Sequence, residues 1–323
     1  MINLYKEVDK KLYIQNDTSE QELEMDRNCW YSVIEPTPDE MKKLKKIVSI
    51  DPDILFSIMD EEESAHLDID DDYTLIVLDV PVYTDGYYET YPFSIIYNDN
   101  FYMTFCKKKI DLFSIMKRKF KKIEPHKHVR LTLQIMYAIA SSYISSLKII
   151  DSKRNDIEKG LQLTMKNDEL LALMDLNKSL VYFSTSLNAN KVVISKTKRL
   201  SEYKRYEDDF DLIEDVEVEN NQAVEMCTIY RDILAGMMDA FASIISNNLN
   251  IVMKALAVIT LIISIPTLVA SLFGMNVLVP FSKNDLGFYI IIGISLILSL
   301  VSGAFLFVFT SKKSYIKRRN KKK

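Results

Sequence analysis

Hydrophobic and polar residues follow three different patterns along this chain of 323 residues. Residues 1 to about 125 contain short β-branched and aromatic runs separated by polar turns. Residues from about 127 to 250 contain no proline, and their apolar residues recur at helical spacing. Two uncharged runs, 255–273 and 286–310, follow near the C-terminus. The pattern predicts an α+β region, a region of long helices and a pair of apolar helices.

The first region alternates strand-like and helix-like segments. A helix is predicted at 37–48, where Thr37 can cap the first turn and Pro38 fits its first position. Strands are predicted in four runs of β-branched and aromatic residues, at 29–36, 73–83, 91–99 and 100–106. We therefore expect an α/β domain with a mixed or antiparallel sheet.

The two uncharged runs are long enough to cross a membrane. Residues 255–273 give roughly 28 Å of helix and residues 286–310 give about 37 Å, against a hydrocarbon core of about 30 Å. A buried helical hairpin in a soluble core is the alternative, but two such runs rarely lie side by side in a soluble protein. The helix that begins near Glu202 is expected to continue without a break into the first run.

Charge indicates the orientation of the two spans. The tail at 311–323 is densely basic, whereas the connector between the spans carries only Lys283 and Asp285. The positive-inside rule then places the C-terminus in the cytoplasm, and two spans return the N-terminal part there as well. No apolar secretory segment is expected at the N-terminus. The expected organisation is an α/β domain at 1–125, a long-helix stalk at 126–250, a first spanning helix at 251–276, an external loop at 277–285, a second spanning helix at 286–310 and the basic tail at 311–323.

Composition argues against several other classes of protein. The net charge of −4 does not suggest nucleic-acid binding. Three scattered cysteines without a CxxC pair argue against a disulfide framework or a thiolate metal site. No catalytic motif is present, so an enzyme and an organic cofactor are not expected. His126 and His128 could in principle bind a metal, but an exposed basic helix start is favoured.

The first apolar run carries a polar stripe. At about 100° per residue its hydroxyl residues fall within roughly 60° of one another on one helix face. Small polar residues of this kind can pack helix against helix, or they can line a water-filled path through an oligomer. Pro266 also frees the carbonyl of Ile262, which needs water or protein as a partner inside a membrane. The stripe, extended toward the cytoplasm, comprises Asn250, Leu256, Thr260, Ser264, Thr267 and Ser271.

The segment "PTLVASLFGMN" at 266–276, followed by a short loop, a second span and a basic tail, resembles the CorA family of magnesium transporters. Gly274, Met275 and Asn276 match the family's signature at its expected place. The stretches 230–254 and 175–193 are similar to the family as well, and 60–83 more loosely. The resemblance implies a funnel-shaped homopentamer with a large cytoplasmic domain, in which the first span of each subunit lines one central pore.

The resemblance also gives the signature a role. Gly274 is expected to end the helix, where a residue without a Cβ is least strained. The freed carbonyls carry the negative end of the helix dipole, which favours a cation. A ring of Asn276 amide oxygens could then accept hydrogen bonds from the waters of a hydrated Mg²⁺ ion. Without the family pattern, Asn276 would be interpreted as a helix C-cap.

Two departures from the family leave the ion open. The external loop carries one acid, Asp285, beside Lys283, and Ser264 is polar where many members have a bulky apolar residue. Leu256 then forms the main hydrophobic constriction. A zinc-transporting branch shares the Gly-Met-Asn signature, and cobalt and nickel are carried by some relatives.

Acidic residues crowd the part before the membrane, around 60–72 and 208–219. Such runs are usually solvated faces. By register with the family, Asp215 falls where relatives place a regulatory magnesium ligand between subunits, and Glu219 lies one turn further. Both interpretations, ion sensor and solvated face, stay open.

The sequence as a whole predicts a multi-pass protein of the cytoplasmic membrane that transports Mg²⁺ and that associates with itself, with membrane lipid and with divalent ions. Transport of zinc, cobalt or nickel by the same fold is the alternative. A membrane-anchored signalling or scaffold protein is a further alternative, but an anchor has no need of a polar stripe.

Overall fold

The computed structural model describes the residues 1–8, 11–16, 26–47, 54, 57–164, 167–275, 280 and 286–319. Two compact units are present, Met1–Gly236 and Met237–Lys323. One uninterrupted helix, α6 (Glu207–Phe273), contributes to both units. The contacts therefore group the helical residues up to Gly236 with the sheet, whereas the sequence suggested separate segments at 1–125 and 126–250.

The first unit is built on a seven-stranded sheet with the order β2-β1-β3-β7-β6-β5-β4. The pair β3–β7 is parallel and the remaining neighbours are antiparallel, so the sheet is mixed, one of the two arrangements that the sequence predicted. The strands are β1 (Ile2–Val8), β2 (Lys11–Gln15), β3 (Cys29–Ile34), β4 (His66–Ile69), β5 (Thr74–Thr84), β6 (Tyr87–Tyr97) and β7 (Tyr102–Cys106).

Local sequence explains the longest hairpin and the first helix. Asp85 (φ 50°) and Gly86 (φ 103°) form the two-residue turn between β5 and β6, a turn in which both residues need positive φ. At the start of α1 (Pro38–Ile47), the Thr37 amide donates to the Glu40 carboxylate at 2.7 Å, and the Glu40 amide donates to the Thr37 hydroxyl at 3.2 Å. This capping box confirms the predicted helix start.

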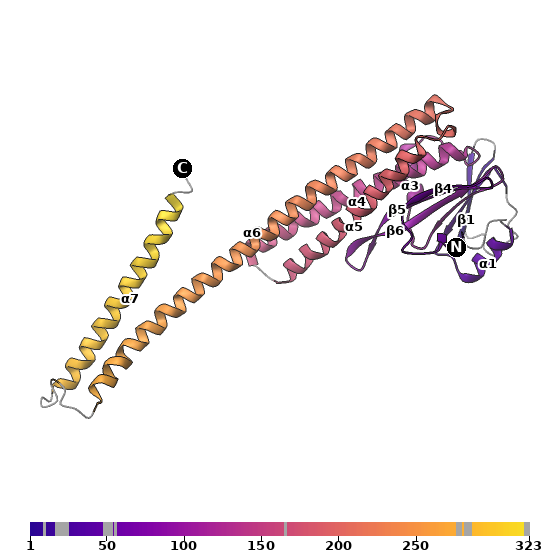
Figure 1. The fold of residues 1–323 in the computed structure, drawn as a ribbon. Helices are drawn as coiled ribbons and strands as arrows, with labels where there is room; N and C mark the ends of the chain where they lie inside the picture. Colours follow the sequence, from indigo (N-terminus) through magenta and orange to yellow (C-terminus); the bar gives the residue numbers. More distant parts are fainter. Residues whose placement is uncertain are drawn as a thin grey trace. The chain divides into compact units, whose positions relative to one another are not determined.

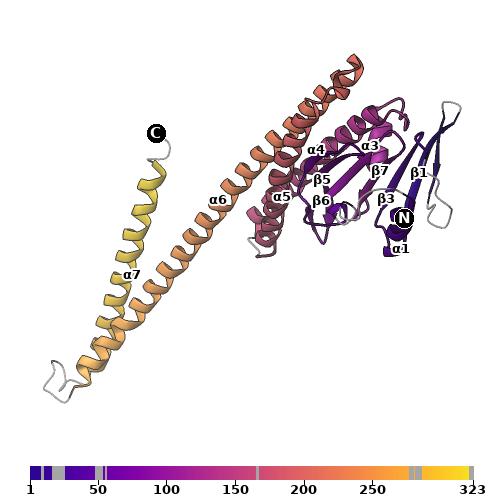
Figure 2. The ribbon, with the colours of Figure 1, turned by 45° about the vertical axis from the view of Figure 1, so that its right-hand side comes forward.

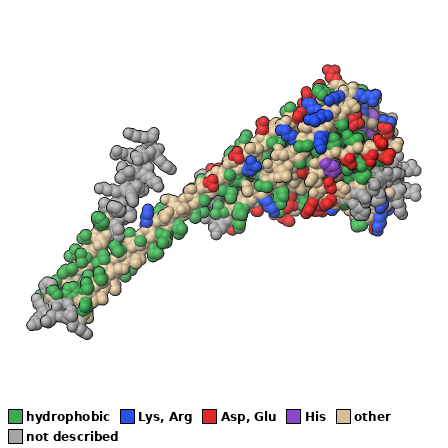
Figure 3. All heavy atoms as spheres, viewed as in Figure 1, with side chains coloured by type: hydrophobic (Ala, Val, Ile, Leu, Met, Phe, Trp, Pro, Cys, Tyr) green, Lys and Arg blue, Asp and Glu red, His purple; other side chains and the backbone are tan. Residues whose placement is uncertain are grey.

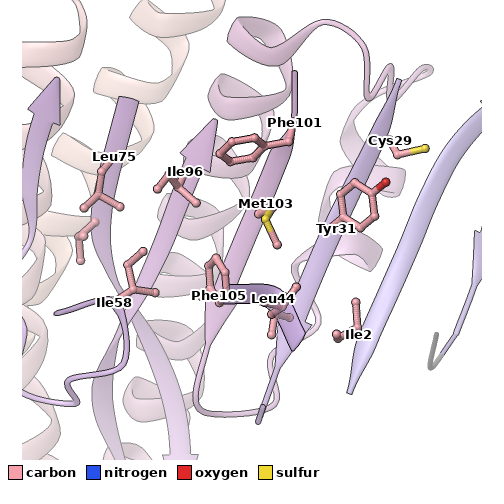
Figure 4. Packing of buried hydrophobic residues seen from close by; sticks show 12 residues of the cluster. Ile2, Cys29, Tyr31, Leu44, Ile58, Leu75, Ile96, Phe101, Met103 and Phe105 are labelled. Carbon is pink, nitrogen blue, oxygen red and sulfur yellow. The ribbon is translucent and has the colours of Figure 1, made fainter. Parts of the chain in front are cut away.

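Both faces of the sheet are covered. On one face, alternate strand residues such as Tyr31, Ile96 and Met103 pack with Leu44 of α1 and with Ile58 (Figure 4). The other face meets the helices α4 (His128–Thr164) and α5 (Asn167–Thr197), which run beside the sheet in both ribbon views (Figures 1 and 2). The helices expected as a stalk therefore serve, in this part, as one layer of the α+β unit.

Side-chain hydrogen bonds fix α5 on the sheet. The buried Asn190 accepts from the amide of Asp79 at 2.8 Å and donates to the carbonyl of Asp79 at 2.9 Å. The hydroxyl of Ser179 accepts from the amide of Tyr88 at 2.9 Å. These contacts bind backbone groups of β5 and β6 to one helix, so the helix register on the sheet is specific.

The long helix begins later than expected. Glu202–Lys204 forms a separate 3₁₀ turn, η1, and α6 starts at Glu207. The fully buried Tyr203 and the side chain of Glu202 both bond the hydroxyl of Tyr97, at 2.8 and 3.0 Å. Anchoring this turn to β6 separates it from α6. Beyond Glu207, the predicted continuity into the apolar run is confirmed. Two further helices among the described residues are α3 (Leu112–Lys119) and α7 (Gly287–Arg319).

Three helices of the described chain are long and apolar enough to cross a membrane: His128–Gly160, Glu207–Phe273 and Gly287–Phe305. The apolar window of the first is 78 % buried within the protein, so it is a core helix. The windows of the other two are 0 % and 11 % buried. Hydrophobic side chains gather over the apolar part of α6 and over the part of α7 that is drawn in colour, whereas charged side chains are frequent on the first unit (Figure 3). The apolar surface of these two helices is large enough to require lipid or another protein.

Candidate functional site

In the second unit, α7 packs against one face of the apolar part of α6. The residues of α6 that are partly buried recur at helical spacing and point toward α7. Gly303 of α7 faces Ile262, since a Cβ added at Gly303 would lie 3.2 Å from Cδ1 of Ile262. Partly buried positions on this face are Val258, Ile265, Val269 and Phe273.

A buried serine of α7 forms a hydrogen bond to α6 close to Pro266. Pro266 has no amide hydrogen, so the carbonyl of Ile262 lacks its usual partner within the helix. The hydroxyl of Ser299, 4 % exposed, donates to that carbonyl at 3.0 Å. The need for a partner at Ile262, predicted from sequence, is therefore met by protein. Ser295 instead donates within α7 to the carbonyl of Ile292 at 2.9 Å.

The polar stripe of α6 lies on the opposite side of the helix. At about 100° per residue, the centre of the stripe is roughly 180° from the centre of the face that meets α7. All four hydroxyl residues are exposed. Packing against α7 within the subunit therefore does not explain the stripe. The residues concerned are Thr260, Ser264, Thr267 and Ser271.

The hydroxyls of the stripe bond their own helix. Thr260 donates to the carbonyl of Leu256 at 2.9 Å, Ser264 to that of Thr260 at 2.8 Å and Thr267 to that of Ile263 at 3.0 Å. These bonds use the hydroxyl hydrogens and leave oxygen lone pairs directed outward. The stripe can therefore accept hydrogen bonds from water or from a hydrated cation.

Toward the N-terminus of α6, the same face continues with apolar residues. Leu256 is 56 % exposed and lies within about 50° of the centre of the stripe. Met253, which the sequence analysis missed, is 55 % exposed and lies nearer to that centre. Met253 lies seven residues, or two helical turns, before Thr260, so the helical period identifies it as a member of the same face. Asn250 is exposed but lies about 70° from the centre, at the edge of this face.

The helix ends where the Gly-Met-Asn sequence begins. α6 ends at Phe273, and the amide of Gly274 donates to the carbonyl of Ala270 at 2.9 Å. Gly274 does not adopt a positive φ, and an added Cβ would meet only the carbonyls of the preceding turn. The helix therefore ends at Gly274 as expected, without a left-handed conformation, and a Cβ at this position would lie 3.2 Å from the carbonyl oxygen of Ala270. Met275 is 54 % exposed, and Asn276 lies outside the described residues.

The acidic run at the start of α6 is divided between ion pairs and solvent. Lys198 binds Glu214 and Glu217 at 3.1 and 2.8 Å. Asp215 is exposed and Glu219 is partly buried. Both carboxylates interact electrostatically with Lys119 of α3. A hydrogen bond to Tyr137 raises the pKa of Lys119, and the carboxylates of Asp215 and Glu219 raise it further.

The other candidate metal ligands are arranged differently. The three cysteines are buried free thiols, and burial raises the pKa of each to about 11. His128 starts α4 and bonds the carbonyl of Arg27 at 3.0 Å. Burial lowers the pKa of His128. His126 lies instead 3.2 Å from the carboxylate of Glu7, so the two histidines do not form one site.

Known proteins resemble this chain along most of its length. A cobalt/magnesium transport protein CorA of Methanocaldococcus jannaschii is 26 % identical over 289 residues, covering 88 % of this chain and 90 % of the relative. One of Thermotoga maritima is 22 % identical over 244 residues, covering 74 % of this chain and 70 % of the relative. The complete structure of the CorA magnesium transporter from Methanocaldococcus jannaschii superimposes with a TM-score of 0.78 at 23 % identity, covering 94 % and 96 % of the two chains.

The family described as CorA-like Mg²⁺ transporter protein matches residues 26–318. This range includes the sheet, the long helices and both apolar helices. The structural likeness supports the same fold, with its mixed sheet and its C-terminal apolar helices. The chain therefore belongs to the CorA-like Mg²⁺ transporter family: it is a membrane protein of divalent-cation transport with C-terminal membrane-spanning helices, and not an enzyme.

Proposed function

We propose that five copies of this chain form a pore for Mg²⁺ across the cytoplasmic membrane, with α6 of each copy lining it. The observation that carries the proposal is the position of the hydroxyl stripe, which faces away from α7 although it lies in the otherwise apolar C-terminal part of α6. Lipid does not favour exposed hydroxyls, and α7 does not cover them. A shared, water-filled axis is the environment that suits this face.

The pore selects the Mg²⁺ ion together with its hydration shell. Magnesium gives up its waters reluctantly and prefers oxygen ligands. The outward lone pairs of Thr260, Ser264 and Thr267 accept hydrogen bonds from the ion's waters along the pore. The Gly274-Met275-Asn276 segment at the end of α6 forms the entrance, where the amide oxygens of Asn276 hold the hydrated ion. Neutral oxygens bind the ion weakly enough to release it.

The apolar part of the same face acts as the gate. Rings of Leu256 and Met253 exclude water when they lie close to the axis, with Asn250 at the cytoplasmic side. Entry needs no ATP, because an inside-negative potential of about 100 mV is worth roughly 4.6 kcal/mol for a divalent ion. That free energy corresponds to more than about a thousandfold in concentration.

The basic tail holds the second span in orientation, so both termini are cytoplasmic. In that topology only the short loop 277–285 faces outward. Protease added to intact cells should cleave at that loop or nowhere. Fragments cut within residues 1–236 under those conditions would disprove the orientation.

Uptake by purified protein in liposomes tests the function. We expect Mg²⁺ to enter under an inside-negative potential. The parent should be compared with an Asn276→Ala variant that remains assembled, and the variant should lose uptake. Normal uptake by the variant would show that Asn276 is only a helix cap. Absence of uptake of any divalent ion by the parent would favour a membrane anchor.

Cobalt is the second candidate ion, because the relatives that match most of this chain are described as cobalt/magnesium transport proteins. Zinc and nickel belong in the same comparison, since Ser264 makes the pore more polar than is common in the family. Faster entry of Co²⁺, Zn²⁺ or Ni²⁺ than of Mg²⁺ at equal concentration would replace the proposed ion and leave the pore unchanged.

A further inference from the structure

A histidine and two glutamates meet at one edge of the α+β unit. Glu7 lies near the end of β1, and Glu124 and His126 flank the buried Pro125 in the segment that leads into α4. One ligand atom from each of the three side chains lies within 4.8 Å of the other two. Nδ1 of His126 is 3.2 Å from Oε2 of Glu7. None of the three residues belongs to the hydroxyl stripe or to the pair Asp215 and Glu219.

The carboxylate of Glu7 supplies an independent indication of a ligand. Its Oε2 atom is buried and accepts no hydrogen bond from the described residues, although the Glu7 side chain as a whole is 20 % exposed. The one close charged neighbour given for this oxygen among the described residues is Nδ1 of His126 at 3.2 Å, an ion pair when the imidazole is protonated. Buried carboxylate oxygens without a hydrogen bond are rare in folded proteins, because leaving such a group unsatisfied costs free energy. A cation between Glu7 and His126 would satisfy that oxygen.

The ligand set indicates which cation fits. Zinc binds imidazole nitrogen and carboxylate oxygen at about 2.0–2.2 Å, so neighbouring ligands of a tetrahedral site lie roughly 3.4 Å apart. The pair of Glu7 and His126 already has this spacing. Imidazole suits Zn²⁺ and Co²⁺, whereas Mg²⁺ prefers oxygen alone. We propose that Glu7, Glu124 and His126 form a site for a transition-metal ion such as Zn²⁺ or Co²⁺, which discriminates against Mg²⁺.

Lys127 and His66 provide two further tests of the proposal. Nζ of Lys127 lies 3.1 Å from the carboxylate of Glu124, so this lysine competes with the metal for one ligand. Elsewhere, His66 pairs with Glu63 at 3.4 Å but is not grouped with a second carboxylate or imidazole in the described chain. His66 therefore provides a matched control, a partly exposed histidine beside a single glutamate.

The experiment measures metal bound by the full-length protein in detergent, with excess Mg²⁺ present to fill oxygen-only sites. We expect one Zn²⁺ per chain that Mg²⁺ does not displace, and a Co²⁺ visible spectrum with nitrogen and oxygen ligands. His126→Gln and Glu7→Gln should each lose that equivalent, whereas His66→Gln should retain it. Lys127→Gln should bind Zn²⁺ roughly two- to fivefold more tightly, in line with the small free energy of an exposed ion pair.

The outcomes separate this site from the pore. The Asn276→Ala variant should keep the Zn²⁺ equivalent whatever its transport activity, because the site does not rest on the proposed function. An equal Zn²⁺ stoichiometry in the parent and in His126→Gln would overturn the proposal and leave only a His126–Glu7 ion pair. Equal loss in His66→Gln would overturn it as well, since binding would then be a general property of exposed histidines.

Discussion

The hydroxyl of Ser299 on α7 donates to the carbonyl of Ile262 on α6 at 3.0 Å, and so replaces the bond that Pro266 removes. Gly303, one turn further along α7, allows the side chain of Ile262 to approach closely. The carbonyl that Pro266 leaves without a partner in α6 is therefore bonded by a residue of α7 that lies 37 positions later in the sequence. This bond fixes which face of α6 meets α7, and hence which face remains for the hydroxyl stripe.

Replacing Ser299 by alanine should weaken the helix pair by roughly 0.6–2 kcal/mol, the range found for hydrogen bonds between membrane helices. The thermal midpoint of the full-length protein in detergent measures this. Pro266→Ala restores an amide hydrogen that can bond Ile262, so the Ser299→Ala effect should shrink in that background. Ser295→Ala is the control, because Ser295 is also buried but bonds its own helix. Equal effects of the two serine substitutions would show that the bond to Ile262 is unimportant.

A cysteine placed on the stripe should react with a charged, membrane-impermeant thiol reagent, because a thiolate forms only in contact with water. Ser264→Cys tests the stripe, and Leu261→Cys, about 60° from Ser264 and about 90° from the centre of the stripe, is the exposed control. The reaction should be at least about tenfold faster at Ser264, as thiol reactivity follows thiolate access. Similar rates at the two positions would place the stripe outside a water-filled path.

The native cysteines should not obscure this measurement. Burial raises the pKa of Cys29, Cys106 and Cys227 to about 11, so at pH 8 these thiols are protonated as well as covered. The parent protein is therefore expected to label only after unfolding. Rapid labelling of the folded parent would contradict the burial of these residues.

If Asp215 and Glu219 bind a regulatory Mg²⁺ ion, Asp215→Asn with Glu219→Gln should require roughly tenfold more Mg²⁺ to close the pore, a coupling of ordinary size. Protease protection of the α+β unit, titrated with Mg²⁺, measures closure. Lys119→Gln should act in the opposite direction, since its charge interacts with both acids and competes with the ion. An unchanged Mg²⁺ response in both variants would identify these residues as a solvated face.

The stability difference between the parent and an Asp79→Asn variant should depend on pH. Burial against α5 raises the pKa of this carboxyl above its ordinary 3.8, and a hydrogen bond from Ser186 offsets part of the shift. The stabilising contribution of the neutral carboxyl is thus complete below pH 3.8 and is lost as the pH rises through the higher folded pKa. Asp79→Asn, which stays neutral, should become more stable relative to the parent between pH 4 and pH 7. The fluorescence of Trp30, the only tryptophan, reports unfolding of this unit. A difference that is constant with pH would contradict the burial of an ionisable Asp79.

Local sequence determined much of this protein. The Thr37–Glu40 capping box and the β-branched runs act through interactions a few residues long, so α1, β3, β5 and β7 were predicted close to their observed bounds. The strand β6 begins at Tyr87 and not at 91, and β1, β2 and β4 were not predicted. The two apolar runs were equally evident, because the length of an uncharged segment alone decides whether it can cross a membrane. The helical period placed the four hydroxyls on one face for the same local reason.

Long-range contacts decided the rest. The 3₁₀ turn at Glu202–Lys204 depends on Tyr97, about a hundred residues away, and could not be distinguished from a helix start by its own sequence. The meeting of Glu7 with His126 depends on how β1 and the segment before α4 pack, and sequence spacing carries no such information. Sequence showed that Ile262 needs a partner, but only the packing of α6 on α7 identified Ser299, because the choice among the serines of α7 is set by the rotation of one helix against the other.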